Sequence, residues 1–278
     1  MKKYIKPVIA VLMAAMLLQA GFAVFAAVSD STNSASQQSP IYESPEDVEI
    51  SEEVLDLIKA SDPANYSRHL VDYKQMLVTL RVHVDLKQEI EKLLIEGYKL
   101  PEVLIGYEFL YHRFGNVDEL RALLSEQSGG EPWNNIFKSY DREHPEFTPR
   151  SFASETLEKL MNTPSLSADD IMIADRFSFV TGQPFEDVIE KKQSASHWYE
   201  ITAKAGLLYS ADELPRVPIT NEQLRKYKAS TGWMEDRITA AFVLADQLGQ
   251  DPNTVILKLK AGGTPEEVAA EIYEAKYR

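Results

Sequence analysis

Glu108 and His112 are the residues whose types and spacing most directly suggest chemistry. They lie four residues apart in a segment with helical periodicity, so their side chains would share one face of a helix. A carboxylate and an imidazole can both bind zinc, but a zinc site needs at least a third protein ligand, and none is evident beside them. We therefore expect a buried, hydrogen-bonded pair rather than a metal site.

No other catalytic motif is present in the sequence. The five histidines form no H-E-x-x-H pattern, and there is no G-x-S-x-G, Walker or dinucleotide-binding glycine pattern. Asp246, Asp251 and Asn253 lack the spacing and the closing glutamate of a calcium loop. The chain has no cysteine, which excludes disulfides and cysteine-ligated zinc. We predict no catalytic residue, no metal ligand and no cofactor.

A repeat of 67 residues organises the elements that would position any site. Gly115, Gly182 and Gly249 are separated by this interval, and each closes a stretch with the pattern of two helices. Apolar residues recur at the same register in the three stretches, which predicts shared core positions. The aligned positions are Ile90, Leu157 and Leu224; Leu104, Ile171 and Ile238; Tyr107, Ala174 and Ala241; and Leu110, Phe177 and Leu244.

Trp133 and Trp198 each open an expected helix at nearly the repeat spacing and precede an isoleucine by three residues. This recurrence favours packing in the core over ligand stacking. The three repeated glycines are expected to end helices in the left-handed conformation. Ser167, Thr220 and Thr264 are expected to cap helices, as is Asp85. Residues 78–84 alternate like a strand.

We expect an all-α fold built from about three and a half imperfect 67-residue helical units, arranged as an α-solenoid or as a compact multi-helix bundle. The expected unit boundaries are residues 44–88, 89–155, 156–222 and 223–278. The helix at residues 101–114 is apolar on nearly all sides, so it is expected at the centre of the fold.

The N-terminus has the order of a secretory signal peptide. Lysines precede an apolar run and small residues in residues 1–26, with a cleavage site expected between Ala26 and Ala27. The alternative is an uncleaved membrane anchor. Residues 27–43 are polar and are expected to form a flexible tether. We therefore expect an extracytoplasmic protein, secreted or held at the cell envelope.

The charge of the chain restricts its partners. The formal net charge is −14, and removing the signal lysines leaves 26 basic against 43 acidic residues. Such an excess repels nucleic acid and anionic lipid headgroups, so we expect neither nucleic-acid binding nor strong binding to anionic membranes. Another envelope protein is the expected partner, and the sequence does not determine the oligomeric state.

Two longer irregular segments, at residues 140–153 and 207–219, interrupt the repeat at matching places. Such departures often bind partners in repeat proteins. The predicted binding residues are Phe147, Arg150, Tyr209 and Arg216 of these segments, together with Trp233, which has no counterpart in the other units.

The repeated glycine, the apolar-periodic helix and the helix-opening tryptophan resemble the repeat of uncharacterised secreted or envelope helical proteins of bacteria. The resemblance covers roughly residues 50–275, and the first copy departs from it with Tyr66 in place of tryptophan. It implies no activity. We expect a binding or scaffolding module of the envelope without catalysis. The alternatives are a glycan-active hydrolase using carboxylates and a self-associating structural component.

Overall fold

The structure is a computed structural model that describes residues 41–144 and 146–278. The expected signal peptide and most of the expected tether lie outside these residues. The described residues are helical apart from loops and one isolated antiparallel bridge between Asn116 and Leu207, which confirms the all-α prediction. Among them, no helix combines the length and apolarity needed to cross a membrane.

Within residues 41–144 and 146–278, fourteen α-helices follow a short 3₁₀ helix, η2 (Pro45–Asp47). They are α2 (Glu52–Ser61), α3 (Tyr66–Thr79), α4 (Val84–Ile95), α5 (Leu100–Tyr111), α6 (Val117–Ser128), α7 (Trp133–Glu143), α8 (Ser154–Met161), α9 (Ala168–Thr181), α10 (Phe185–Ser194), α11 (Trp198–Lys204), α12 (Asn221–Thr231), α13 (Glu235–Gln247), α14 (Pro252–Lys260) and α15 (Pro265–Tyr277).

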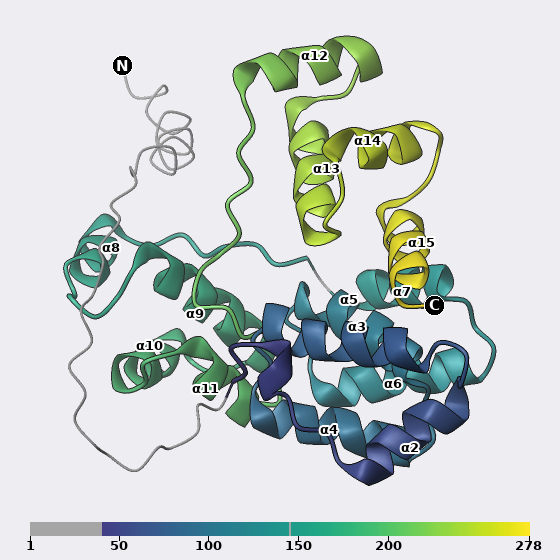
Figure 1. Ribbon diagram of the computed structural model, residues 1–278. Helices are drawn as coiled ribbons and strands as arrows, with labels where there is room; N and C mark the ends of the chain where they lie inside the picture. The colour runs from purple at the N-terminus through teal and green to yellow at the C-terminus, as the bar shows by residue number, and fades with distance from the viewer. Residues whose placement is uncertain (1–40, 145) are drawn as a thin grey trace, which may run out of the picture. The chain divides into compact units, whose positions relative to one another are not determined.

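These helices recur with the period of the sequence repeat (Figure 1). Helices α4 to α7 form one unit of four helices, α8 to α11 the next, and α12 to α15 the last. Helices α2 and α3 match the second half of a unit, because α2 is the counterpart of α6, α10 and α14. Val54, Val188 and Val255 occupy the same register of this helix, and all three are buried.

Helix α5 lies at the centre of the first full unit, as its sequence predicts. Every residue from Leu100 to Tyr111 is buried, and the helix packs against α3, α4, α6 and α15. Gly106 lets α6 and α7 approach it closely, since a Cβ at this position would lie 2.8 Å from Leu120 Cδ1 and 3.4 Å from Trp133 Cη2. A side chain there would force these helices apart.

The expected helix caps hold with one exception. The hydroxyls of Ser167, Thr220 and Thr264 accept hydrogen bonds from the third residue of their helices. The predicted cap Asp85 is wrong: His83 precedes α4, and its ring accepts the bond from the Asp85 amide. The strand predicted at residues 78–84 is also wrong, because α3 runs to Thr79 and α4 begins at Val84.

The repeated glycines differ in how they end their helices. Gly182 (φ 69°) and Gly249 (φ 60°) are left-handed, as predicted. At the first copy the left-handed residue is Phe114 (φ 60°). Gly115 is needed there for a different reason: a Cβ on it would lie 2.9 Å from the Leu110 Cβ. The spacing therefore marks a helix end in each case, with two physical causes.

The last helix returns to the first full unit. Helix α15 packs against α7 and α5, with Tyr273 and Tyr277 almost completely buried (Figure 1). Arg68 of α3 donates hydrogen bonds to the carbonyls of Ala275, Lys276 and Arg278 at its end. In an open stack each unit would contact only the units next to it in the sequence. Here the last unit also contacts the first full unit.

Two helices at corresponding positions, α8 and α12, are peripheral in their units. Helix α8 has no buried residue, and α12 buries only Tyr227. Their counterpart α4 buries Leu86, Ile90, Leu93 and Leu94 together with the stem of Lys87. The first helix of the unit is thus packed in one copy and largely uncovered in the other two.

Candidate functional site

A groove of about 760 Å³ lies between α10 and α11. Phe177, at the end of α9, and Ile201 of α11 form an apolar floor with Ala195 and Ala205. Volumes of this size are typical of sites that bind ligands or peptide segments.

The rims of the groove are charged. Asp187, Glu190 and Lys191 line it from α10, and Glu200 and Lys204 line it from α11. The α10 residues are exposed, so their charges remain hydrated when the groove is empty. Lys191 also donates a hydrogen bond to the side chain of Gln183. The rims carry one more acidic than basic side chain, which favours ligands with basic groups over anions.

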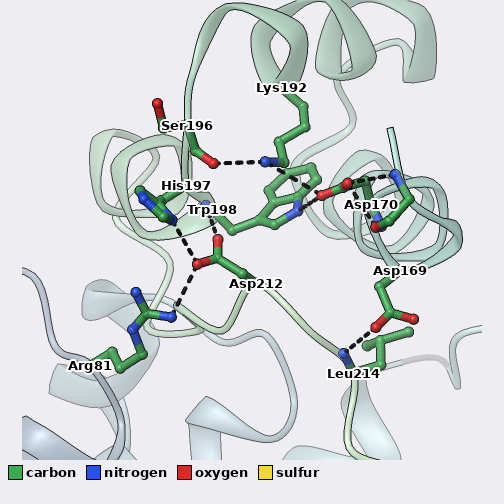
Figure 2. Close-up of polar contacts among 10 residues, drawn as sticks. Arg81, Asp169, Asp170, Lys192, Ser196, His197, Trp198, Asp212 and Leu214 are labelled. Carbon is green, nitrogen blue, oxygen red and sulfur yellow. Dashed lines mark hydrogen bonds and ion pairs between the residues drawn. The ribbon is translucent and has the colours of Figure 1, made fainter. Parts of the chain in front are cut away.

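A buried tryptophan fixes α11, and with it one wall of the groove. Trp198, the first residue of α11, is fully buried and donates from Nε1 to Asp170 Oδ1 at 2.8 Å (Figure 2). Lys192 of α10 lies 3.5 Å from the same oxygen and donates to the Ser196 carbonyl at 3.0 Å. These contacts join α9, α10 and α11 around one carboxylate.

The carboxyl group of Asp170 is held ionised. Burial alone would raise its pKa, but hydrogen bonds from the Ser167 amide and hydroxyl and from Trp198 outweigh burial, and Lys192 adds a favourable charge. The result is a pKa below the usual value. The ionised group thus holds α9, α10 and α11 together through Trp198 and Lys192.

Asp212, in the connector after α11, is the second junction in this region (Figure 2). Its carboxylate accepts from the Trp198 amide at 2.7 Å, from His197 Nδ1 at 2.9 Å and from Arg81 Nη1 at 3.1 Å. It therefore caps the start of α11 from outside the helix and ties it to the turn between α3 and α4. Tyr199 stacks on His197 at 4.9 Å between ring centroids.

Arg150 and Arg216, predicted as binding residues, both form ion pairs with buried aspartates of α9. Arg150 donates from its amide to Asp175 at 2.8 Å and from Nε at 2.5 Å. Arg216 Nη2 lies 3.1 Å from both oxygens of Asp169, which also accepts from the Leu214 amide. Their guanidinium groups are thus already engaged, and a partner would have to compete with these bonds.

Phe147 and Tyr209 are brought together, but not on one exposed face. Arg176 of α9 lies over the ring of Phe114 at 4.4 Å and near that of Phe147 at 5.8 Å. Phe114 also stacks on Tyr209, with 3.9 Å between the ring centroids. Tyr209 is only 4% exposed, while Phe147 is half-buried, and the binding role of both stays a prediction.

Trp233 is half-buried in the turn between α12 and α13, apart from the other predicted residues in the sequence and in its contacts. The guanidinium of Arg237 lies 4.1 Å from its ring centroid. The other two tryptophans are at most 1% exposed, which confirms that they pack in the core. Trp233 is thus the tryptophan with the most accessible face.

The expected pairing of Glu108 with His112 does not form. Glu108 accepts from Lys276 Nζ, at 2.8 Å to each oxygen, and from the Tyr277 hydroxyl. Burial, with Arg113, Lys276 and Arg176 nearby, lowers the pKa of His112 to about 4, so the ring is neutral. Glu108 and His112 are four residues apart, as their spacing predicts, but the Glu108 carboxylate binds Lys276 and Tyr277 of α15 instead. Among the described residues, no three His, Asp or Glu side chains gather as a metal site.

The groove residues were missed by sequence reasoning because charged residues on a helix resemble a solvated surface. A signal does exist in the repeat. Lys191 and Ser194 of α10 stand two periods after Leu57 and Ala60 of α2, where the leading unit has apolar contacts. Comparing the same helix between units would have shown that this face is apolar in α2 and polar in α10.

The chain matches no protein-family model, and no curated protein or solved structure matches it.

Proposed function

We propose that this protein is a binding module that holds a basic amphipathic segment of a partner protein in the groove between α10 and α11. The groove carries the proposal, because it joins an apolar floor of Phe177 and Ile201 to charged rims. An amphipathic helix that enters a groove needs this combination: apolar side chains pack on the floor and charged ones meet the rims.

Charge determines the kind of segment. Asp187, Glu190 and Glu200 outnumber Lys191 and Lys204 on the rims, and the whole chain carries a formal net charge of −14. A basic segment is therefore attracted during the encounter and paired after docking. An acidic segment would meet repulsion from most of the surface.

The proposed location is extracytoplasmic. It rests on the order of charged, apolar and small residues in residues 1–26 and on the expected cleavage before Ala27. A partner of the same compartment, at the cell envelope, is the one that the groove would meet.

Site-specific photocrosslinking in the native host tests the proposal. A crosslinking residue replaces Ser194 in the groove, and a second chain carries it at Glu155 on the exposed face of α8 as a matched control. We expect a discrete adduct from position 194 alone, lost when Ile201→Glu places a charge on the floor. The crosslinked partner peptide should be basic and amphipathic. Equal adducts from both positions, or an acidic partner segment, would contradict the proposal.

A second candidate function is glycan hydrolysis at the same groove. It is favoured by the three carboxylates of Asp187, Glu190 and Glu200 beside an apolar floor. Release of reducing ends from cell-wall glycan by the purified chain, abolished in Glu190→Gln and Glu200→Gln and retained in Glu155→Gln, would support it. Without such release the groove is a binding site only.

A further inference from the structure

We propose that the occupant of this groove is helix α12 of a second copy of the chain, so that the protein self-associates through contacts between α10 and α12 of different copies. The inference rests on the proposed function of the groove and names its partner. Three observations support it: the repeat register, the uncovered outer face of α12, and the complementary charges of α10 and α12.

The register comes from the leading helices, where the same contact is made within one chain. Helix α2 packs against α4, and α10 is the counterpart of α2 while α12 is the counterpart of α4, each two periods later. If the units packed alike, α12 would therefore lie on α10. In the described part of the chain α10 packs instead mainly against α9 and α11, and α12 mainly against α13.

Two cavities share one wall in this register, formed by α2 in one and by its counterpart α10 in the other. The smaller one, of about 270 Å³, is lined by Leu57, Ala60 and Ser61 of α2. Their counterparts are Lys191, Ser194 and Ala195, all of which line the larger groove. The opposite wall of the small cavity is the end of α4 and the turn that follows, including Leu94 and Leu100. Opposite α10 the groove is instead lined by α11, through Glu200, Ile201 and Lys204.

The counterparts of the α4 wall are exposed in α12 and just before α13. Lys228 corresponds to Leu94, and Met234 corresponds to Leu100. Leu94 and Leu100 are buried, whereas Lys228 is exposed and Met234 is 74% exposed. Met234 is the most exposed of the large apolar side chains in the described residues. A side chain of this kind at a helix end is suited to an apolar floor.

The charges of the two helices are complementary. Helix α10 presents Asp187 and Glu190, three residues apart and both exposed. Helix α12 presents Arg225 and Lys228 at the same spacing, both exposed, and a second copy would compete with Glu235 for Lys228. Lys191 on the rim opposes this pairing, although Gln183 accepts a hydrogen bond from it. A contact built on exposed ion pairs is expected to be weak and sensitive to salt.

A second copy is favoured because α12 is held away from α10 by its own unit. Tyr227 packs edge-on against Phe242 of α13 at 5.5 Å. Lys260 of α14 donates to the Ser230 carbonyl at the end of α12, and Lys228 lies 3.3 Å from Glu235. These contacts use Tyr227, Lys228 and the end of α12, and leave Arg225 of α12 and Met234 before α13 exposed. Two copies can then satisfy both grooves reciprocally in a closed dimer.

Sedimentation velocity of the purified chain over a concentration series tests the inference. One variant reverses the groove charges (Asp187→Lys with Glu190→Lys), and a second reverses the helix charges (Arg225→Glu with Lys228→Glu). The matched control reverses two exposed acids of α8, Glu155→Lys with Glu158→Lys. We expect the wild type and the control to dimerise, and each test variant to dimerise at least about tenfold more weakly.

Mixing the two test variants gives the decisive result. The intact α12 of the first variant meets the intact groove of the second, and the two reversed surfaces also match. We therefore expect dimers in the mixture. If α12 instead docked in the groove of its own chain, mixing the two variants would not increase the fraction of dimer. Circular dichroism of each variant shows whether its helices remain folded.

Three outcomes would overturn the inference: a wild type that stays monomeric, a dimer that neither variant weakens, or a dimer weakened by the groove variant but not by the α12 variant. A monomeric wild type that still crosslinks a different protein from position 194 would leave the proposed function standing. A monomer that crosslinks nothing from that position would remove both.

Discussion

Two buried tryptophans use their indole N–H groups in the same way in successive units. Trp133 Nε1 donates to Glu102 at 2.7 Å, and Trp198 Nε1 donates to Asp170 at 2.8 Å. Each tryptophan is the first residue of its helix, and each acid is the third residue of the helix it packs against. In the last unit the first residue of α15 is Pro265 and the third residue of α13 is Arg237. At these helix positions the indole donor and the carboxylate acceptor are therefore both absent. The recurrence identifies the pair as a structural link.

Replacing either tryptophan by phenylalanine should therefore destabilise the protein. Trp133→Phe and Trp198→Phe each leave a buried acid without one donor and open a small cavity, and we expect the free energy of unfolding to fall by about 2–4 kcal/mol. Trp233→Phe is the matched control, since its ring is half-buried, and a change within about 0.5 kcal/mol is expected. Urea unfolding measures all three. Equal effects at the three positions would contradict the interpretation.

His112 should make the stability depend on pH on the acidic side. Its pKa is lowered from 6.5 to about 4 in the folded chain, chiefly by burial. The unfolded chain therefore binds the proton first, and the stability contributed by the neutral ring is present above pH 6.5 and is lost as the pH falls toward 4. The loss corresponds to about 3 kcal/mol.

Comparing the wild type with His112→Gln at pH 7 and pH 4.5 checks this value. We expect a smaller decrease in the free energy of unfolding for the variant, because glutamine does not titrate. If both proteins lost the same stability, other groups would be responsible for the acid sensitivity.

At the scale of the elements, α5 and α9 share a pattern of buried acids that other segments neutralise. Glu102 and Glu108 of α5 correspond to Asp169 and Asp175 of α9 at the repeat spacing, and all four are buried. On α5 the cations come from the end of the chain, where Arg278 and Lys276 pair with these acids. On α9 they come from the irregular connectors. The connectors thus have a structural role, because they supply the cations that neutralise the buried acids of α9.

Removing a connector arginine should cost stability. Arg150→Ala leaves Asp175 without its cation, and Arg216→Ala does the same to Asp169, while backbone amides still donate to both. We expect each variant to lose about 1–3 kcal/mol in the free energy of unfolding. Arg225→Ala, on the exposed face of α12, is the control and should stay within about 0.5 kcal/mol. Thermal or urea unfolding gives the comparison, and unchanged stability would return both arginines to a role in binding.

At the scale of the whole molecule, the return of α15 joins the last unit to the first full one. Tyr273 of α15 lies 6.3 Å from Phe137 of α7 between ring centroids and is 2% exposed. A repeat protein whose units contact only their neighbours can unfold from one end. Here that route is blocked by a contact between units far apart in the sequence, so we expect cooperative unfolding of α4 to α15.

Tyr273→Ala tests this coupling. The substitution removes a large buried side chain between α15, α5 and α7, and a loss of about 3–5 kcal/mol is expected together with a broader transition. Leu257→Ala on α14, a side chain that is 56% exposed, is the control and should leave the transition unchanged. Fluorescence and circular dichroism should give one midpoint for the control and separate midpoints for Tyr273→Ala. Coincident midpoints in both would show that α15 does not couple the units.

Much of the fold was predictable from the sequence because apolar periodicity and helix ends are local signals. Residues 101–114 were expected at the centre, and α5 is buried along its whole length. Ser167, Thr220 and Thr264 cap helices because a side-chain oxygen can satisfy the free amides of the first turn in any context. Errors arose where a local pattern had two interpretations, as at residues 78–84, which alternate like a strand but continue and start helices.

The groove and the partners of the buried acids were decided only by the tertiary structure. The sequence by itself determined the helical class, the 67-residue period, the core position of Trp133 and Trp198 and the acidic charge, because each depends on neighbours along one helix or on composition. It could not pair Glu108 with Lys276, or Asp169 with Arg216, since these residues are 168 and 47 positions apart. Nor could it show that α4 is packed while α12 is not. These features depend on which helix faces meet in space, and identical periodicity along the chain is compatible with either arrangement.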